Sequence, residues 1–193
     1  MSLMVRECVL PGVMEVTPRR IDDDRGWFAE TWNAARFSEA GLARDWVQDN
    51  QSFSAEAGTL RGLHYQAPPF AQTKLVRVLA GAVRDVVVDA RAGSPTYGQH
   101  VAFDLSAEVG NQAFVPAGCL HGFITLQPNT MVHYKVDAPY SAAHDGAVAW
   151  NDPDLGIDWG LGRDGLPDEP IVSGKDARAP RLAEADLPFR FEA

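Results

Sequence analysis

The sequence predicts an all-β protein built as a sandwich or barrel of short strands. Short runs of β-forming residues recur along most of the chain and are separated by turn residues, which is the pattern of such folds. Only one stretch has a helical pattern, and no internal repeat or low-complexity segment is present. With 193 residues, 46% of them hydrophobic and 22% charged, the chain can bury a sizeable core. We therefore expect one all-β domain over residues 1–193.

The individual elements are predicted from these runs in chain order. Strands are expected over residues 13–17, 27–32, 45–50, 58–64, 73–79, 82–89, 99–105, 112–115, 121–126, 130–136 and 147–150. A short helix is expected from Asn33 to Ala40, ending at Gly41. After Trp150 the chain is rich in Pro, Gly and Asp, so residues 151–193 are expected to form a meandering segment that covers the sheet.

One pair of predicted strands suggests a hairpin with a defined register. The runs 74–79 and 82–89 flank Ala80-Gly81, which has the length of a two-residue turn. If residues 79 and 82 pair, Asp85 becomes the diagonal neighbour of Lys74 on the same face. A partly buried lysine needs such a partner, so we expect Lys74 and Asp85 to form a pair among valines.

Charge and composition argue against some classes of binding partner and indicate where in the cell the protein is expected. The net charge is -9, with 17 basic and 26 acidic residues, and this field repels nucleic acid and anionic membranes. No apolar run approaches the roughly 18 residues of a membrane span. The start does not resemble a signal peptide, and the second methionine, Met4, suggests that residues 1–3 are a cloning remnant. Two cysteines, Cys8 and Cys119, cannot form a disulfide framework, so a reducing cytoplasm is expected.

Polar side chains are concentrated in several of the predicted strands. An inward polar group on a strand is unfavourable unless it is hydrogen-bonded, so such a concentration is more typical of a lined pocket than of a core. Local arginines and lysines there could bind a phosphorylated small molecule despite the global charge. The densest groups are Gln48-Asp49-Asn50-Gln51-Ser52, Thr59 to Gln66, Gln72 to Arg77, Pro116 to Phe123, Tyr134-Lys135, Tyr140 and Trp150-Asn151-Asp152-Pro153.

The types of residue in these groups favour acid–base chemistry over the alternatives. His64 is followed by Gln66 rather than by a second histidine, and two histidines with neutral amides make a poor metal site. Cys119 and His121 are too close on one strand for a thiol–imidazole pair, and no nucleophile elbow is present. No phosphate-binding glycine loop is present either. Proton transfer by histidine, tyrosine and lysine, without a cofactor, remains.

The same motifs, in the same order and spacing, resemble the dTDP-4-dehydrorhamnose 3,5-epimerase family from about Gly12 to about Pro180. The resemblance is carried by Asp24 to Glu30, Gln48-Asp49-Asn50, Leu60-Arg61-Gly62-Leu63-His64-Tyr65-Gln66, Lys74-Leu75-Val76, Ser94 to Gly98, Leu105-Ser106, His121-Gly122-Phe123, Tyr134-Lys135, Trp150 to Pro153 and Ser173 to Asp176. So many short motifs in one order are far more specific than any single one.

The resemblance implies a fold, an assembly and a set of roles. The fold would be a cupin-type jelly roll with a few short helices, dimerised by exchange of N-terminal strands, with no metal and no organic cofactor. His64 would be the base, Asp176 its orienting carboxylate and Tyr134 the acid. Lys74 would stabilise the enolate oxygen, and the hairpin register described above adds Asp85 as its expected partner. The remaining substrate-binding residues would be Arg25, Phe28, Glu30, Gln48, Asp49, Asn50, Arg61, His121, Tyr140, Asp145 and Lys175, with Lys74 also contacting the ligand.

Two alternatives stay open beside the inversion of both C3 and C5 of dTDP-4-dehydro-6-deoxy-D-glucose. One is a relative that inverts only C3 or only C5, and the other is a sugar-nucleotide binding protein without catalysis. The sequence also departs from the family pattern at His144-Asp145-Gly146, where the family usually has glutamate. Cys119-Leu120 also replaces the more usual Phe-Ala pair. Neither departure touches the expected base or acid.

Overall fold

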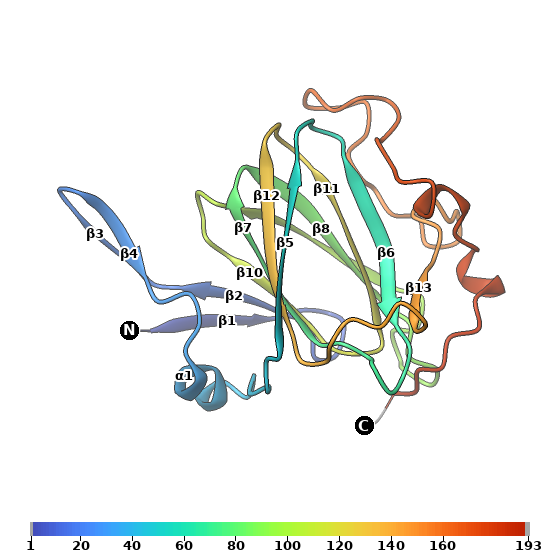
Figure 1. The fold of residues 1–193 in the computed structure, drawn as a ribbon, viewed down its shortest axis with the longest axis horizontal. Coiled ribbons are helices and arrows are strands. Elements are labelled where there is room, and N and C mark those ends of the chain that lie inside the picture. Colours follow the sequence, from blue (N-terminus) through green and yellow to red (C-terminus); the bar gives the residue numbers. More distant parts are fainter. Residues whose placement is uncertain (1, 192–193) are drawn as a thin grey trace.

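The structure is a computed structural model that describes residues 2–191 and shows two β-sheets packed face to face. Met1, in the expected remnant, and Glu192-Ala193, at the end of the expected covering segment, lie outside the described residues. The all-β prediction is confirmed (Figure 1). Within residues 2–191 no helix is long and apolar enough to cross a membrane.

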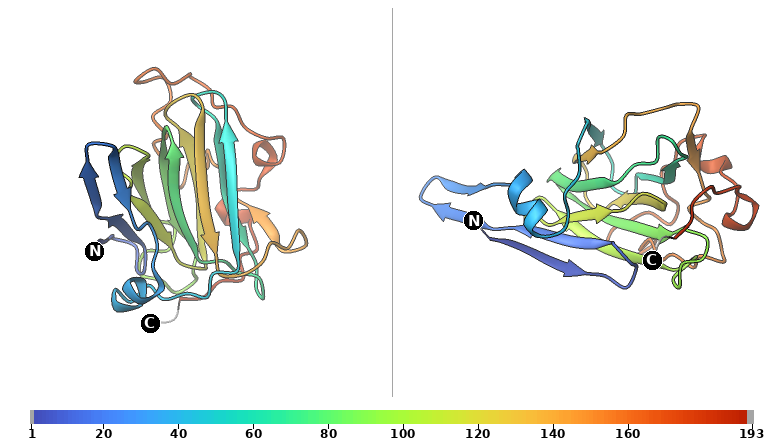
Figure 2. Two further views of the ribbon diagram at one scale, coloured as in Figure 1. Left: turned by 60° about the vertical axis from the view of Figure 1, so that its left-hand side comes forward. Right: turned by 90° about the horizontal axis from the view of Figure 1, so that it is seen from below.

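The first sheet has six strands in the order β1-β2-β10-β7-β12-β5, and the second has five in the order β13-β6-β11-β8-β9. A separate hairpin, β3–β4, extends away from the sandwich, as Figures 1 and 2 show. The strands are β1 (Leu3–Glu7), β2 (Met14–Pro18), β3 (Arg20–Asp23), β4 (Gly26–Ala29), β5 (Gln48–Ser54), β6 (Leu60–Gln66), β7 (Lys74–Ala80), β8 (Ala82–Asp89), β9 (His100–Ser106), β10 (Gln112–Val115), β11 (Cys119–Thr125), β12 (Thr130–Val136) and β13 (Asp145–Ala147).

Strands β5 to β12 form a jelly roll. Along this stretch the chain passes from one sheet to the other at every step except β8 to β9. The resulting orders, β10-β7-β12-β5 in one sheet and β6-β11-β8-β9 in the other, are those of two interlocked Greek keys. All neighbouring strands in both sheets are antiparallel. Strands that are distant in sequence therefore lie side by side.

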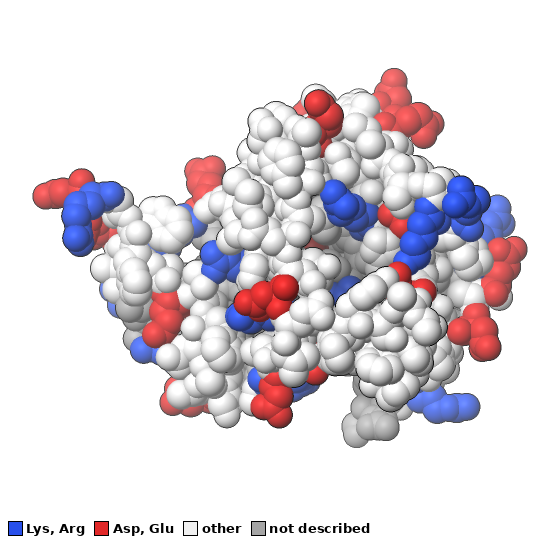
Figure 3. Space-filling model, in the orientation of Figure 1, with Lys and Arg blue, Asp and Glu red and all other residues white. Residues whose placement is uncertain are grey.

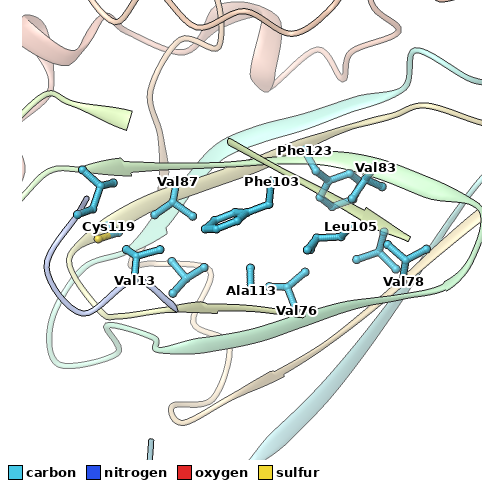
Figure 4. Packing of buried hydrophobic residues seen from close by; sticks show 13 residues of the cluster. Val13, Val76, Val78, Val83, Val87, Phe103, Leu105, Ala113, Cys119 and Phe123 are labelled. Atoms are coloured by element: carbon cyan, nitrogen blue, oxygen red, sulfur yellow. The ribbon is translucent and has the colours of Figure 1, made fainter. Parts of the chain in front are cut away.

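The space between the sheets is a dry core over much of its length. Alternate residues of each strand point inward, so Val76 and Val78 of β7 meet Val83 and Val87 of β8 across the sandwich (Figure 4). Phe103 fills the centre, where the two layers of side chains meet. Burial of this apolar surface is the main force that holds the sheets together.

Parts of both outer faces are covered as well. On the six-stranded sheet, helix α1 (Ala34–Glu39) places Phe37 over Leu75 and Phe114. The side chain of Asn33 caps this helix by accepting a hydrogen bond from the Arg36 amide at 3.2 Å. On the five-stranded sheet, the C-terminal segment contributes Leu155, Trp159, Leu182 and Phe189, together with the 3₁₀ turns η1 (Asp176–Arg178) and η2 (Leu182–Glu184). These residues pack against the outer face of the five-stranded sheet.

Three of the predicted strands agree with the observed ones at both ends. Residues 82–89, 112–115 and 130–136 match β8, β10 and β12 to the residue, and the predicted helix differs from α1 by one residue at each end. Strands β1 and β3 were not predicted, and the last predicted strand, 147–150, is displaced to 145–147. The missed strands are short and largely exposed, so they lack the apolar alternation that marks a strand.

The expected hairpin between residues 74–79 and 82–89 is wrong. Strand β7 pairs with β10 and β12, whereas β8 pairs with β9 and β11 in the other sheet. Only Gly81 separates the two strands, which is too short for a two-residue hairpin turn, and the chain crosses between sheets there. Gly81 has φ +77, and a Cβ on it would lie 2.3 Å from the Thr130 hydroxyl, so glycine is needed at this corner.

Candidate active site

A cavity of about 490 Å³ opens between the two sheets, beside the dry core. Figure 3 shows a hollow on this face with basic side chains gathered along its right-hand rim. The same inward alternation that builds the core builds this cavity, but here the inward residues are polar. Strand β5 contributes Gln48, Asn50 and Ser52, while His64 and Arg61 come from β6. Polar side chains within a sandwich therefore mark the place where the sheets enclose a solvent-accessible site.

His64 forms a hydrogen-bonded pair with Asp176 at the wall of the cavity. The His64 Nε2 atom lies 2.7 Å from Asp176 Oδ1. Asp176 reaches the site from η1 of the C-terminal segment, 112 residues further along the chain. Burial alone would raise the pKa of this carboxyl, but hydrogen bonds from His64, the Gly62 amide and Ser173 outweigh burial and lower it. An ionised Asp176 can only accept, so the proton lies on Nε2 and Nδ1 is left as the free base.

A second histidine–carboxylate pair lies deeper. His121 Nε2 is 2.8 Å from Asp85 Oδ2, on the neighbouring strand β8. His121 is paired directly with His64 across β11 and β6, so the two imidazoles are neighbours. Asp85 is fully buried and does not line the cavity, whereas His121 does. The cavity is thus lined by two imidazoles, each held by its own carboxylate.

The facing sheet contributes Lys74 on β7 and Tyr134 on β12. Burial lowers the pKa of Lys74 to about 8, although the charges of Asp85 and Asp145 oppose this shift. Burial and the charge of Asp145 raise the pKa of Tyr134, while Arg61 opposes them. The cavity therefore holds an ammonium group that titrates near neutral pH and a phenol that keeps its proton.

The rim of the cavity is a connected polar network. The Lys175 ammonium pairs with the carboxylate of Asp145, and the Tyr140 hydroxyl donates to the same carboxylate at 3.3 Å. The Tyr140 amide donates to Gln48 Oε1 at 3.0 Å, and Gln48 Nε2 donates to Asn50 at 2.7 Å. Tyr140 itself is 59% exposed, so its ring presents a flat apolar face at the mouth.

Two glycines bring the histidine-bearing strands together. Gly62 has φ +143, and a Cβ on it would lie 2.5 Å from the Gly122 Cα atom. A Cβ on Gly122 would in turn lie 2.9 Å from the Arg61 carbonyl oxygen. Only residues without side chains allow this approach of β6 and β11. The Gly62 amide also points toward Asp176 Oδ2, at 3.5 Å.

The structure brings together most of the predicted site residues. The members that line one cavity are His64, Tyr134, Lys74, Asp176, Gln48, Asn50, Arg61, His121, Tyr140, Asp145 and Lys175. Lys74 and Asp85 do influence each other electrostatically, but they do so across the sandwich from facing sheets and not as hairpin neighbours. Asp85 is therefore placed to act through other residues and not on a ligand.

Four predicted ligand contacts are not found in the cavity of the same chain. Asp49 alternates with Gln48 and Asn50 on β5, so it points to the outer face, where it accepts from Lys135 Nζ at 2.9 Å. Because successive side chains of a strand point to opposite faces, Asp49 lies outside the cavity that Gln48 and Asn50 line. Glu30 pairs with Arg36 at 2.9 Å. Arg25 and Phe28 lie at the tip and on β4 of the projecting hairpin.

Several lining residues were not predicted as site residues. Strand alternation from Asn50 could have identified Ser52, and Gln66 and Gln72 belonged to the polar runs already noted. Ser173 begins the Ser173 to Asp176 motif, whereas Ile171 and Val172 carry no such signal, because no local pattern shows that the residues before this motif also line the cavity. The C-terminal segment is held there by the Leu60 amide, which donates to the Ile171 carbonyl at 2.9 Å.

The side chains of the cavity include two histidines and two carboxylates, but among the described residues they are not grouped as metal ligands. Within residues 2–191 no group of three or more His, Cys, Asp or Glu side chains is arranged to hold a metal ion. The two histidines of the cavity are each bound to their own carboxylate.

Comparison with known proteins places this arrangement in a family. The sequence profile described as dTDP-4-dehydrorhamnose 3,5-epimerase matches residues 7–184. The chain belongs to this family. A dTDP-4-dehydrorhamnose 3,5-epimerase of Sinorhizobium fredii is 47% identical over 180 residues, which cover 91% of this chain and 88% of the relative.

Solved structures of the family share the fold closely. The epimerase of Bacillus anthracis, solved with TDP and pyrophosphate bound, is 46% identical, with a TM-score of 0.88 over 93% of this chain and 99% of the other. The Legionella pneumophila enzyme, in complex with dTDP-4-keto-L-rhamnose, is 38% identical, with a TM-score of 0.92 and full coverage of both chains. A 3'-monoepimerase of Streptomyces bikiniensis is 34% identical, with a TM-score of 0.85 over 93% of this chain and 88% of the other.

Proposed function

We propose that this protein inverts C3 and C5 of dTDP-4-dehydro-6-deoxy-D-glucose to give dTDP-4-dehydro-L-rhamnose, as an isomerase of dTDP-L-rhamnose synthesis. The observation that carries the proposal is the pair formed by His64 of β6 and Asp176 of η1, set in the same cavity as Lys74 and Tyr134 of the facing sheet. Together these groups supply a base, a cation for a developing oxyanion and an acid. Epimerisation beside a ketone needs these three functions.

His64 acts as the base. With the proton of Nε2 held by Asp176, Nδ1 takes the proton from the carbon next to the 4-keto group. Asp176 stays ionised and stabilises the imidazolium that forms. The carbon–hydrogen bond breaks, and its electron pair moves into the enolate.

Lys74 stabilises that enolate. A fixed cation in a partly desolvated site favours the charge that develops on the keto oxygen during proton removal. Because the pKa of Lys74 is lowered to about 8, the ammonium is present at neutral pH and is lost as the pH rises through that value. The rate should therefore fall above about pH 8 as the oxyanion loses its partner.

Tyr134 returns the proton on the other face of the sugar. Inversion requires the acid and the base on opposite sides of the ring, and Tyr134 projects from β12 of the sheet that faces His64. Burial raises the pKa of the phenol, so its proton is available for transfer at neutral pH.

The nucleotide diphosphate is bound at the rim. Arg61 and Lys175 offer positive charge to the phosphates, and an arginine fork can hold two oxygens at once. Gln48 and Asn50 are suited to hydrogen bonds with the nucleotide, and the exposed ring of Tyr140 is placed to pack against its edge. Asp145 occupies the position of the usual glutamate and holds Lys175 and Tyr140 in place.

Two copies of the chain form a dimer that exchanges N-terminal segments. The β3–β4 hairpin is the N-terminal pair of strands that joins neither sheet of its own chain, which favours it as the exchanged segment. The hairpin leaves Trp27 and Phe28 55% and 61% exposed, far more than such large apolar residues show in a core. Arg25 and Phe28 would then reach the cavity of the partner subunit, with Glu30 at the base of the hairpin.

Mixed dimers test the exchange. The Arg25→Ala and His64→Ala variants should each be impaired alone, while a mixture of the two should regain activity. One site of the mixed dimer combines an intact His64 with an intact Arg25 from the other copy. No recovery after proven subunit exchange, or a monomer by light scattering, would show that Arg25 does not serve a partner.

The number of inverted carbons can be measured directly. The chain is 47% identical to a 3,5-epimerase and 34% identical to a 3'-monoepimerase, which favours inversion at both carbons. Incubation with dTDP-4-keto-6-deoxyglucose in D₂O should place deuterium at both C3 and C5, as read by NMR. Label at one carbon only would contradict the double inversion, and no label with bound nucleotide would indicate a binding protein.

We also propose that the reaction uses neither a metal nor an organic cofactor, and that it takes place in the cytoplasm. Base, acid and oxyanion partner are all side chains of this chain, and Cys8 and Cys119 are free thiols, as in a reducing compartment. Activity should survive EDTA treatment. Loss of activity that iron or zinc restores would contradict the cofactor-free mechanism.

A further inference from the structure

The carboxylate of Asp85 is the most deeply buried charged group next to the cavity. Strand β8 points Val83 and Val87 into the dry core, and Asp85 shares their inward face. The residue has no exposed surface, and Phe123 lies opposite it in the register of β8 and β11. A carboxylate in such surroundings is strongly disfavoured unless other groups compensate its charge. The groups that compensate the charge of Asp85 are therefore the key to its role.

One oxygen of Asp85 has a partner and the other does not. Oδ2 lies 2.8 Å from His121 Nε2. Oδ1 is buried and has no hydrogen-bond partner within residues 2–191. A buried acceptor without a hydrogen bond is uncommon, so a positive charge nearby is expected to compensate it.

Lys74 supplies that charge from the facing sheet. Strand β7 points Val76 and Val78 into the same core, and Lys74 is the next inward residue toward the cavity. Among the described residues its ammonium makes no hydrogen bond or ion pair, and Asp85 is the strongest of the charges that favour its protonated form. Lys74 thus lines the cavity, and the carboxylate of Asp85 that opposes its charge lies deeper, outside the cavity lining.

We propose that Asp85 is a positioning residue that serves two groups of the cavity at once: it orients His121 through a hydrogen bond and keeps Lys74 cationic under the substrate ketone. The proposal deepens the proposed epimerase function and rests on it for the role of Lys74. Asp85 does not touch the ligand and so acts through its two neighbours. Its buried charge would be the reason why a lysine at the edge of the apolar core remains an ammonium at neutral pH.

Other groups that face Lys74 do not replace Asp85. Asp145 of β13 shares its charge with Lys175 and Tyr140 at the rim. His121 of β11, together with His64 and Arg61 of β6, is neutral or positive and cannot favour a second cation. Tyr134 of β12 stays a neutral phenol, because burial raises its pKa.

The test is the titration of Lys74 itself, followed by the ¹³Cε signal of the labelled lysine in wild type and in Asp85→Asn. Without the Asp85 carboxylate, the Lys74 ammonium loses a nearby opposite charge. The pKa of Lys74 should therefore fall from about 8 by roughly one to two further units. The alkaline limb of the deuterium-exchange profile should move to lower pH by the same amount. The matched control is Asp104→Asn, which removes one negative charge from the exposed partner of Arg84 and should shift neither.

The outcomes separate this inference from the proposed function. If Asp85→Asn folds and the Lys74 midpoint does not move, Asp85 does not control Lys74 and the inference fails. If the Lys74 titration midpoint moves but the wild-type protein exchanges no substrate hydrogen, the coupling of Asp85 to Lys74 stands and the epimerase proposal fails. Should Asp85→Asn not fold, the ¹³Cγ signal of Asp85 in wild type decides. It should show an inflection near pH 8 when Lys74 loses its proton, and its absence would overturn the inference.

Discussion

The two histidine–carboxylate pairs of the cavity are neighbours on paired strands, yet they differ in depth. The His64 side chain is 33% exposed and Asp176 is 3% exposed, whereas His121 and Asp85 are 7% and 0% exposed. Asp176 comes from the C-terminal segment and is surrounded by donors, while Asp85 comes from the next strand and has one oxygen without a hydrogen bond.

This difference in exposure suggests two separate roles for the two histidine–carboxylate pairs. A proton carrier must reach the substrate and must have its other nitrogen fixed, which His64 achieves at the cavity wall. A group that shapes the electrostatic field works best where water is excluded, which suits the deep pair beside Lys74. The more exposed pair, His64–Asp176, is therefore suited to transfer the proton, and the buried pair, His121–Asp85, is suited to support the reaction electrostatically.

The largest expected effect is the loss of the exposed imidazole. His64→Ala should lower the rate of deuterium exchange by about 10⁴-fold, because no other group takes the proton. His121→Ala should lower it by about 10²-fold, because the base remains and only the support is lost. Both variants should still bind dTDP by calorimetry. Equal losses in the two variants would remove the distinction between the pairs.

A smaller loss is expected when the orienting carboxylate is neutralised. Asp176→Asn no longer fixes the Nε2 proton or stabilises the imidazolium, so the turnover number should fall by about 10²–10³-fold. Since the pair works as a unit, adding His64→Ala to this variant should cost little beyond His64→Ala alone. Additive losses in the double variant would show that Asp176 acts independently of His64. Thermal melting checks that each variant is folded.

The smallest effect is expected at the rim. Tyr140→Ala should weaken dTDP binding by about 10-fold and leave the turnover number nearly unchanged, because the ring packs against the nucleotide and not against the reacting carbons. Tyr140→Phe keeps the ring and loses only the hydrogen bond to Asp145, so it should bind almost as wild type does. A large fall in turnover for either variant would place Tyr140 in the chemistry.

The sequence was sufficient for the fold class, for the approximate position of most strands and for most of the residues that line the cavity. Alternation of polar and apolar residues is a local property, and the spacing of motifs around His64, Lys74 and Tyr134 matched a family pattern. Alternation on β5, once the strand is defined, also separates Asn50 from Asp49, a distinction that the prediction missed.

Tertiary structure alone decided which strands face each other. A single glycine at position 81 sends β8 into the other sheet, so Lys74 and Asp85 meet across the sandwich and not along a hairpin. The family resemblance anticipates that Asp176 orients His64, but the course of the C-terminal segment along β6, with the Leu60 amide donating to the Ile171 carbonyl, is visible only in the structure. Such pairings depend on how whole sheets pack against each other, and a short stretch of sequence carries no information about that packing.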